Sequence, residues 1–247
     1  MESLMLESLI KQRFHAARET YHKNAIIQNA MQDVLWNLLQ SRENLGNVLE
    51  LGAGCGILSK KIAQTHTFSR FLAVDLVDFT ESFAHFATPS GQKIEFIQAN
   101  FENITQNILD IRFDVIISNA ALQWSNQRAL LPKLSALLHT NGILLFSTFG
   151  KQNFKEMRAM FNVGLEYLEL EDYPPLLENC KILESFKQTR VLQFNSALEV
   201  FKHLKNTGVN ATKEHFRLTK THLSAYAEKF SNKLTYDMLF ILAQKLH

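Results

Sequence analysis

The chain has 247 residues, is 46% hydrophobic and carries a formal net charge of +2. Such a chain can form one large domain or one domain with an appendage, and its four prolines argue against long disordered linkers. No apolar run reaches the roughly eighteen residues of a membrane span. The near-neutral charge does not suggest a dedicated nucleic-acid binder, and the N-terminal segment lacks the pattern of a signal peptide.

Cys55 and Cys180 are the only cysteines. Two cysteines give neither a disulfide framework nor a metal-ligand pattern, which indicates a reducing, cytoplasmic compartment and no metal site. The sequence leaves the oligomeric state open.

Apolar strands alternate with helices through the first 150 residues. Continuously apolar strands between helices are typical of a parallel sheet that is covered on both faces. The hydrophobic spacing predicts helices at 7–22, 25–40, 56–64 and 127–139, the last stopped by Asn141–Gly142, and strands at 47–51, 70–76, 93–99, 113–120 and 142–149.

The pattern changes after residue 150. Helices are expected at 153–168, 196–206 and 219–230, with Ser196 as an N-cap, a loop at 172–180, and strands at 189–194 and 234–245. We expect a single domain over 1–247, made of N-terminal helices (1–45), a cofactor-binding half (46–150), a substrate-side insertion (151–189) and C-terminal strands and helices (190–247).

A glycine loop in "VLELGAGCGIL" (48–58) carries the strongest functional signal. Three of the nine glycines, Gly52, Gly54 and Gly56, stand within five positions. A strand, a glycine loop and a helix place a ligand at the helix N-terminus. The dinucleotide fingerprint is incomplete because position 57 is isoleucine, and the Gly-Lys-Ser/Thr of a phosphate-binding P-loop is absent.

The stretch "ELGAGCG" resembles the first motif of class I S-adenosylmethionine-dependent methyltransferases. The resemblance implies a Rossmann-like α/β fold, with a mostly parallel seven-stranded sheet, helices on both faces and an antiparallel C-terminal strand. It also implies S-adenosylmethionine as the cofactor. The cofactor contacts that we expect are Glu50, Gly52, Gly54, Gly56, Asp75 at the ribose hydroxyls, Asn100 at the adenine amine in place of the family's usual acidic residue, Phe101 on the adenine face, and Asn119 at the methionine end.

Four further stretches resemble one family, the malonyl-(acyl-carrier-protein) O-methyltransferases of biotin synthesis. They are "FHAARETYHKNAIIQ", with Phe14, Ala17, Tyr21 and Gln28, then "FDVIISNAALQW", "ALEVFKHLKNTGVNA" and "LTYDMLF". The resemblance implies methylation of the free carboxyl of malonyl-acyl carrier protein, whose methyl ester primes pimeloyl assembly. The carrier protein is expected to be acidic.

The expected reaction does not require a general base from the protein. A malonyl carboxylate is ionised at neutral pH and can attack a sulfonium methyl without a general base. The enzyme then supplies alignment and a dry site, for which Tyr21 and Trp124 are the expected catalytic residues. Gln123, Arg158 and Lys205 are candidate substrate contacts.

Two alternatives remain open at this point. One is a class I methyltransferase that acts on another small carboxylic acid or a quinone-like phenol. The other is a cofactor-binding protein without transferase activity.

Overall fold

The computed structural model describes residues 11–12, 24–86, 88–89, 91–107, 111–162, 164–207 and 218–247. The chain divides into two compact units. The larger unit comprises Gln28–Gly150, Leu168–Lys187 and Leu239–His247, and the smaller unit comprises Met1–Ile27, Lys151–Tyr167 and Gln188–Met238. The expected division into segments of one domain stays a prediction. The helix expected at 7–22 lies outside the described residues, apart from 11–12.

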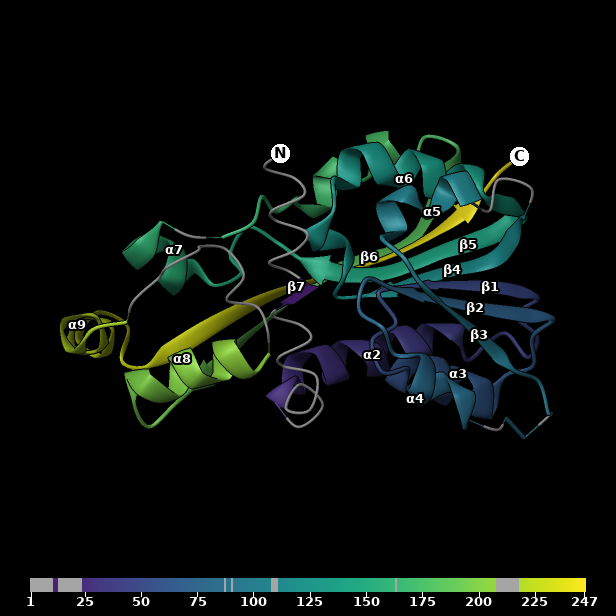
Figure 1. The fold of residues 1–247 in the computed structure, drawn as a ribbon. Helices are drawn as coiled ribbons and strands as arrows, with labels where there is room; N and C mark the ends of the chain where they lie inside the picture. Colours follow the sequence, from purple (N-terminus) through teal and green to yellow (C-terminus); the bar gives the residue numbers. More distant parts are fainter. Residues whose placement is uncertain are drawn as a thin grey trace. The chain divides into compact units, whose positions relative to one another are not determined.

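A seven-stranded sheet confirms the expected fold class (Figure 1). The strand order is β3-β2-β1-β4-β5-β7-β6, with β7 as the antiparallel C-terminal strand. Strands β1 to β5 pair in parallel. The strands are β1 (Asn47–Leu51), β2 (Arg70–Asp75), β3 (Ile94–Gln98), β4 (Phe113–Asn119), β5 (Leu138–Phe149), β6 (Cys180–Gln193) and β7 (Lys233–Lys245).

Helices cover both faces of this sheet in the larger unit, because the central strands are apolar on both sides. Val48 and Leu49, neighbours on β1 that point to opposite faces of the sheet, are both fully buried. On one face lie α2 (Ile26–Leu39), α3 (Ile57–Thr65) and α4 (Thr80–Ala84), and on the other lie α5 (Phe101–Asn107) and α6 (Gln127–Ala136) (Figure 1). The short α4 and α5 were not expected from the sequence.

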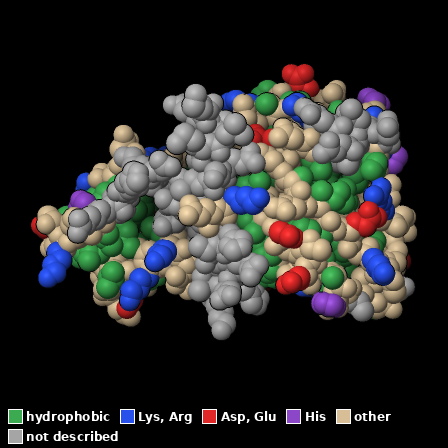
Figure 2. Space-filling model, viewed as in Figure 1, with side chains coloured by type: hydrophobic (Ala, Val, Ile, Leu, Met, Phe, Trp, Pro, Cys, Tyr) green, Lys and Arg blue, Asp and Glu red, His purple; other side chains and the backbone are tan. Residues whose placement is uncertain are grey.

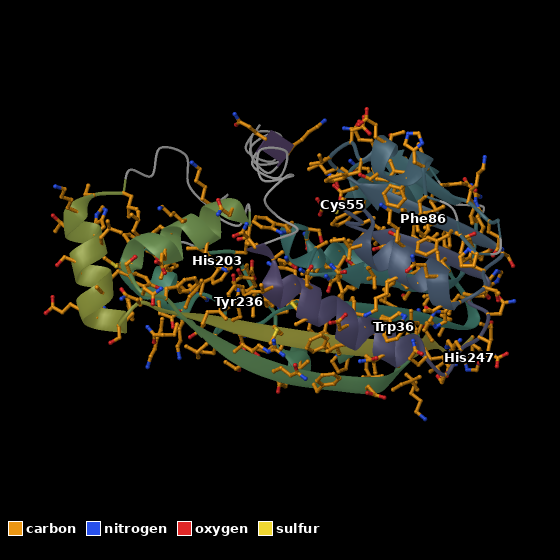
Figure 3. The ribbon with its side chains drawn as sticks, turned by 90° about the horizontal axis from the view of Figure 1, so that it is seen from below. Trp36, Cys55, Phe86, His203, Tyr236 and His247 are labelled. Atoms are coloured by element: carbon orange, nitrogen blue, oxygen red, sulfur yellow. The ribbon has the colours of Figure 1, made fainter. Side chains whose placement is uncertain are left out.

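Three helices belong to the smaller unit: α7 (Lys155–Phe161), α8 (Ala197–Asn206) and α9 (Lys220–Phe230). The Ser196 side chain accepts a hydrogen bond from the Glu199 N–H, which confirms the expected N-cap of α8. The buried His203 and Tyr236, labelled in Figure 3, join α8 to β7 through a 2.7 Å hydrogen bond. Strands β6 and β7 each have residues in both units.

The predicted helix stop at Asn141–Gly142 is wrong. Helix α6 already ends at Ala136, and both residues lie within β5, where the pairing with β4 shifts register. Asn141 has a left-handed φ of 66°, and a Cβ on Gly142 would stand 2.9 Å from the carbonyl oxygens of His139 and Phe113. A left-handed residue followed by glycine forms a β-bulge here instead of a helix C-cap.

Two other boundaries differ from the sequence prediction. The helix expected at 153–168 ends at Phe161, because Asn162 takes a left-handed φ of 50°. The strand expected at 189–194 begins earlier, at Cys180, and forms the long β6. The segment expected as a loop at 172–180 contains the 3₁₀ turn Pro174–Leu176.

Candidate functional site

The glycine loop joins β1 to α3, and its three glycines have different roles. All three have left-handed φ angles, 70°, 54° and 80° for Gly52, Gly54 and Gly56. A Cβ on Gly52 would stand 2.3 Å from Ala121 Cβ, and one on Gly56 would stand 2.7 Å from the Phe83 ring. A Cβ on Gly54 would have no atom of a described residue within 4 Å. Packing therefore requires glycine at 52 and 56, whereas Gly54 borders open space.

Asp75 ends β2 and holds this loop in place. Its Oδ2 accepts a hydrogen bond from the Gly54 N–H at 2.8 Å, and its Oδ1 accepts one from the Val77 N–H at 2.8 Å. Burial raises the pKa of this carboxyl, and the backbone hydrogen bonds oppose that rise. Each carboxylate oxygen has further acceptor capacity beside its backbone donor, so the geometry is compatible with a hydroxyl-bearing ligand.

Glu50 lies on β1 below the loop and is 2% exposed. Ser59 of α3 donates a 2.5 Å hydrogen bond to Glu50 Oε2. Burial raises the pKa of Glu50 to about 8, the Ser59 hydrogen bond opposes the rise, and the charge of Asp75 adds to it. The contact joins α3 to β1, and the expected role of Glu50 toward a cofactor stays a prediction.

Asn100 has a structural role that the sequence did not predict. Its Oδ1 accepts a hydrogen bond from the Glu102 N–H at 2.9 Å, in the first turn of α5. This is the geometry of a helix N-cap. The neighbouring Phe101 is buried and lies close to the glycine loop. A Cβ built on Gly52 would stand 3.9 Å from its ring. The expected contacts of both residues with adenine stay predictions.

Asn119 ends β4, beside β1, and both ends of its amide are engaged by the protein. Its Nδ2 donates to the carbonyl oxygen of Gln28 at 3.1 Å, and its Oδ1 accepts from Ser147 Oγ at 2.7 Å. Gln28 itself is 2% exposed, and its buried side-chain Oε1 has no hydrogen-bond partner among the residues that the structure describes.

A buried acceptor without a donor is unfavourable, so Gln28 Oε1 marks a place where a ligand donor fits. Gln28 belongs to the N-terminal stretch that resembles the family, but it is not among the site residues expected from the sequence. That resemblance was the only signal that could have found it.

Gln123 and Trp124 lie on a 3₁₀ turn, Leu122–Trp124, that follows β4. The Gln123 Nε2 donates to the Ala120 carbonyl oxygen at 2.5 Å, and its Oε1 accepts from Thr148 Oγ1 at 3.3 Å. These contacts brace the turn that carries the half-buried Trp124. A substrate contact for Gln123 stays a prediction.

The remaining predicted substrate residues are not in the larger unit. Arg158 and Lys205 belong to the smaller unit. Arg158 Nη2 donates to the Asn153 carbonyl oxygen at 2.9 Å, and its guanidinium lies 5.5 Å from the centroid of the Tyr167 ring. Lys205 is exposed on α8. Tyr21 lies outside the described residues.

Cys55, labelled in Figure 3, lies within the glycine loop, and burial raises the pKa of its thiol. A thiol with a raised pKa is a poor nucleophile. The residues that the structure describes contain no cluster of His, Cys, Asp or Glu that could hold a metal ion. None of their helices is long and apolar enough to cross a membrane.

The sheet reverses its strand order between β1 and β4, and the glycine loop and Asn119 lie at the carboxyl ends of those two strands. Ligands of open α/β sheets bind at such a switch point. The fold and this loop define the class: a Rossmann-like, class I methyltransferase. The family described as "Methyltransferase domain" matches residues 49–144.

A malonyl-(acyl-carrier-protein) O-methyltransferase of Haemophilus influenzae is 34% identical over 98% of this chain and 95% of its own length. One of Calditerrivibrio nitroreducens is 32% identical over 95% of this chain and 96% of its own length. The chain belongs to the malonyl-(acyl-carrier-protein) O-methyltransferase family.

A solved structure shares the fold at lower sequence identity. The N-methyltransferase NodS of Bradyrhizobium japonicum, in complex with S-adenosyl-L-homocysteine, has a TM-score of 0.56 and 14% identity. The match covers 92% of this chain and 99% of that chain.

Proposed function

We propose that the chain transfers a methyl group from S-adenosylmethionine to the free carboxyl of malonyl-acyl carrier protein. The methyl ester then primes pimeloyl synthesis for biotin, and the reaction takes place in the cytoplasm. The observation that carries the proposal is the match to relatives of that name over 95% and 98% of the chain, which includes the smaller unit as well as the glycine loop.

The residues of the larger unit fit the cofactor. The open side of Gly54 lets a ligand approach the backbone closely. Asp75, held 2.8 Å from the Gly54 N–H, has acceptor capacity for ribose hydroxyls. When bound, S-adenosylmethionine would supply an electrophilic methyl group on a sulfonium.

Gln28 and Asn119 are the residues proposed for the methionine end of the cofactor. The engaged amide of Asn119 fixes the backbone of Gln28, while Gln28 Oε1 is a buried acceptor that has no donor in the described part of the chain. The α-amino group of the cofactor is a donor of the right kind for this oxygen. Asn119 would then act by positioning Gln28.

The proposed chemistry needs alignment and exclusion of water more than proton transfer. The acceptor carboxylate is ionised near pH 7, so no residue has to remove a proton from it. Trp124, on the braced turn after β4, is proposed as an aromatic wall, and Tyr21 as a second one. Arg158 and Lys205 remain proposed cations for the malonyl carboxylate.

The test is a methyl-transfer assay with labelled S-adenosylmethionine and three acceptors: malonyl-acyl carrier protein, free malonate and a quinone-like phenol. We expect turnover with the carrier-linked acceptor, and a kcat that stays flat between about pH 6 and 8, well above the carboxyl pKa. Turnover on the phenol alone, with a basic limb near neutrality, would contradict the proposal. Tight cofactor binding without turnover on any acceptor would identify a binding protein instead.

A further inference from the structure

A lysine-lined depression lies entirely within the smaller unit, and no role proposed above uses it. Its volume is about 630 Å³. Three lysines from separate elements line it: Lys155 at the start of α7, Lys229 near the end of α9, and Lys233 at the start of β7. We call it the lysine pocket. Figure 2 shows Lys and Arg side chains over the region of α8 and α9.

The lysine pocket has an excess of positive charge. None of its three exposed lysines forms an ion pair with any residue that the structure describes. The pocket holds one acidic residue, Glu156, which is 4% exposed. Its two carboxylate oxygens accept hydrogen bonds from the backbone N–H and the Oγ1 of Thr235. Glu156 is therefore committed to the protein, and the three ammonium groups remain for a partner.

Apolar surface accompanies these charges. Val191 of β6 is 53% exposed, and the half-buried Phe230 also lines the pocket. The Lys229 ammonium is 5.4 Å from the centroid of the Phe230 ring. Exposed apolar side chains ringed by charged ones are typical of protein interaction sites.

The rim of the pocket is held in one shape by short contacts. Tyr226 OH donates to the Lys233 carbonyl oxygen at 2.6 Å, and Gln193 Nε2 donates to the Ser231 carbonyl oxygen at 2.7 Å. The turn between α9 and β7 is fixed further by the left-handed φ angles of Ser231 and Asn232, 50° and 58°. A preformed surface loses little conformational entropy on binding.

We propose that the lysine pocket is the docking site for an acidic face of the carrier protein that bears the malonyl group. The inference rests on the proposed function, because it assumes that the acceptor is attached to a protein. Charge complementarity selects the occupant: three lysines that have no ion pair within the described residues, on a partly apolar surface, favour an acidic protein face. Such charges speed the encounter and make it sensitive to salt.

The experiment reverses the charge of the pocket in the full chain, as Lys155→Glu, Lys229→Glu and Lys233→Glu together. A control variant, Lys93→Glu, Lys133→Glu and Lys181→Glu, changes the net charge equally at exposed lysines of the larger unit. Each variant is assayed with malonyl-acyl carrier protein and with S-malonyl-N-acetylcysteamine, a small thioester without a protein. A Lys→Gln triple at the same pocket positions serves if the Glu triple fails to fold.

We expect the pocket variant to raise the KM for the carrier-linked acceptor by about tenfold or more, with a weaker salt dependence. Its KM and kcat for the small thioester should match those of the wild type. Equal effects of the pocket and control variants, or an unchanged KM for the carrier protein, would overturn the docking site while leaving the proposed function intact. A wild-type chain that methylates neither acceptor would overturn the proposed function itself.

Discussion

The backbone N–H of Gly54 donates a 2.8 Å hydrogen bond to Oδ2 of Asp75, across 21 positions of the chain. This contact joins the loop after β1 to the last residue of β2. It places the one glycine of the loop that borders open space next to a half-buried carboxylate.

Asp75→Asn should weaken the binding of S-adenosylmethionine by about 1–3 kcal/mol, because the amide cannot accept hydrogen bonds through both of its ends. Isothermal calorimetry measures the loss. Asp78→Asn, three positions further along on an exposed loop, is the matched control and should bind normally. Equal affinities for both variants would remove Asp75 from the site.

Gly54→Ala should lower the affinity for S-adenosylmethionine by more than its loss of stability explains. The substitution strains a left-handed residue, which costs about 1–2 kcal/mol, and its methyl group enters open space. Gly91→Ala is the control, since Gly91 also has a left-handed φ, 73°, and no atom of a described residue lies within 4 Å of its Cβ position. We expect similar falls in melting temperature for both, but a loss of affinity of about tenfold or more for Gly54→Ala alone. Normal binding by that variant would mean that no ligand approaches Gly54.

Glu50 should make the protein less stable as the pH rises. Its pKa is about 8 in the folded state against an ordinary value of 4.5, so the folded state holds the proton more tightly. The stabilisation is complete below about pH 4.5 and is lost as the pH rises to about 8, by at most about 1.4 kcal/mol per pH unit. The raised pKa of Asp75 acts in the same direction.

Urea unfolding at pH 5 and pH 8 measures this effect. Glu50→Gln removes the titrating group, and its amide oxygen can still accept from Ser59. The free energy of unfolding of the variant minus that of the wild type should therefore be larger at pH 8 than at pH 5. If this difference in unfolding free energy is the same at both pH values, the raised pKa of Glu50 is ruled out.

Asn100 should prove to be both a helix cap and a cofactor contact. Asn100→Ala removes the cap of α5 and should cost about 1 kcal/mol of stability, together with cofactor affinity. Asn100→Asp keeps an acceptor at the helix N-terminus and should preserve or improve both. Asn126→Ala removes the equivalent cap of α6, in which Asn126 Oδ1 accepts from the Ala129 N–H, and should cost only stability. If Asn100→Ala also costs only stability, Asn100 is a cap alone.

Gln28→Leu should lower the affinity for S-adenosylmethionine, because it removes the buried acceptor proposed for the α-amino group. A charge-assisted hydrogen bond of this kind is worth about 1.5–3 kcal/mol. Gln28→Glu should keep the affinity, since a carboxylate also accepts from an ammonium group. Gln32→Leu, one turn further along α2 and 8% exposed, is the matched control. A Gln28→Leu variant that is more stable and binds the cofactor normally would show that the unpaired oxygen serves no ligand.

The positions of the parallel strands were predictable from the sequence, because buried parallel strands are continuously apolar and the glycine loop is a local signal. The bulge at Asn141–Gly142 was not, since a left-handed residue before glycine suits a helix C-cap and a β-bulge equally well. Gln28 was missed as a site residue for a different reason. Its significance depends on which buried acceptor lacks a donor, and that is set by contacts between distant segments.

The long strands β6 and β7 have a practical consequence for dissecting the protein. A fragment that stops at Gly150 keeps every predicted cofactor residue, yet it loses β7, the neighbour of β5 in the sheet. The bare edge would expose unpaired backbone groups along a strand whose residues 142–149 are all buried in the intact chain. Such an edge is a template for aggregation. The shortest fragment that keeps this edge covered therefore has to reach β7, and so carries parts of both compact units.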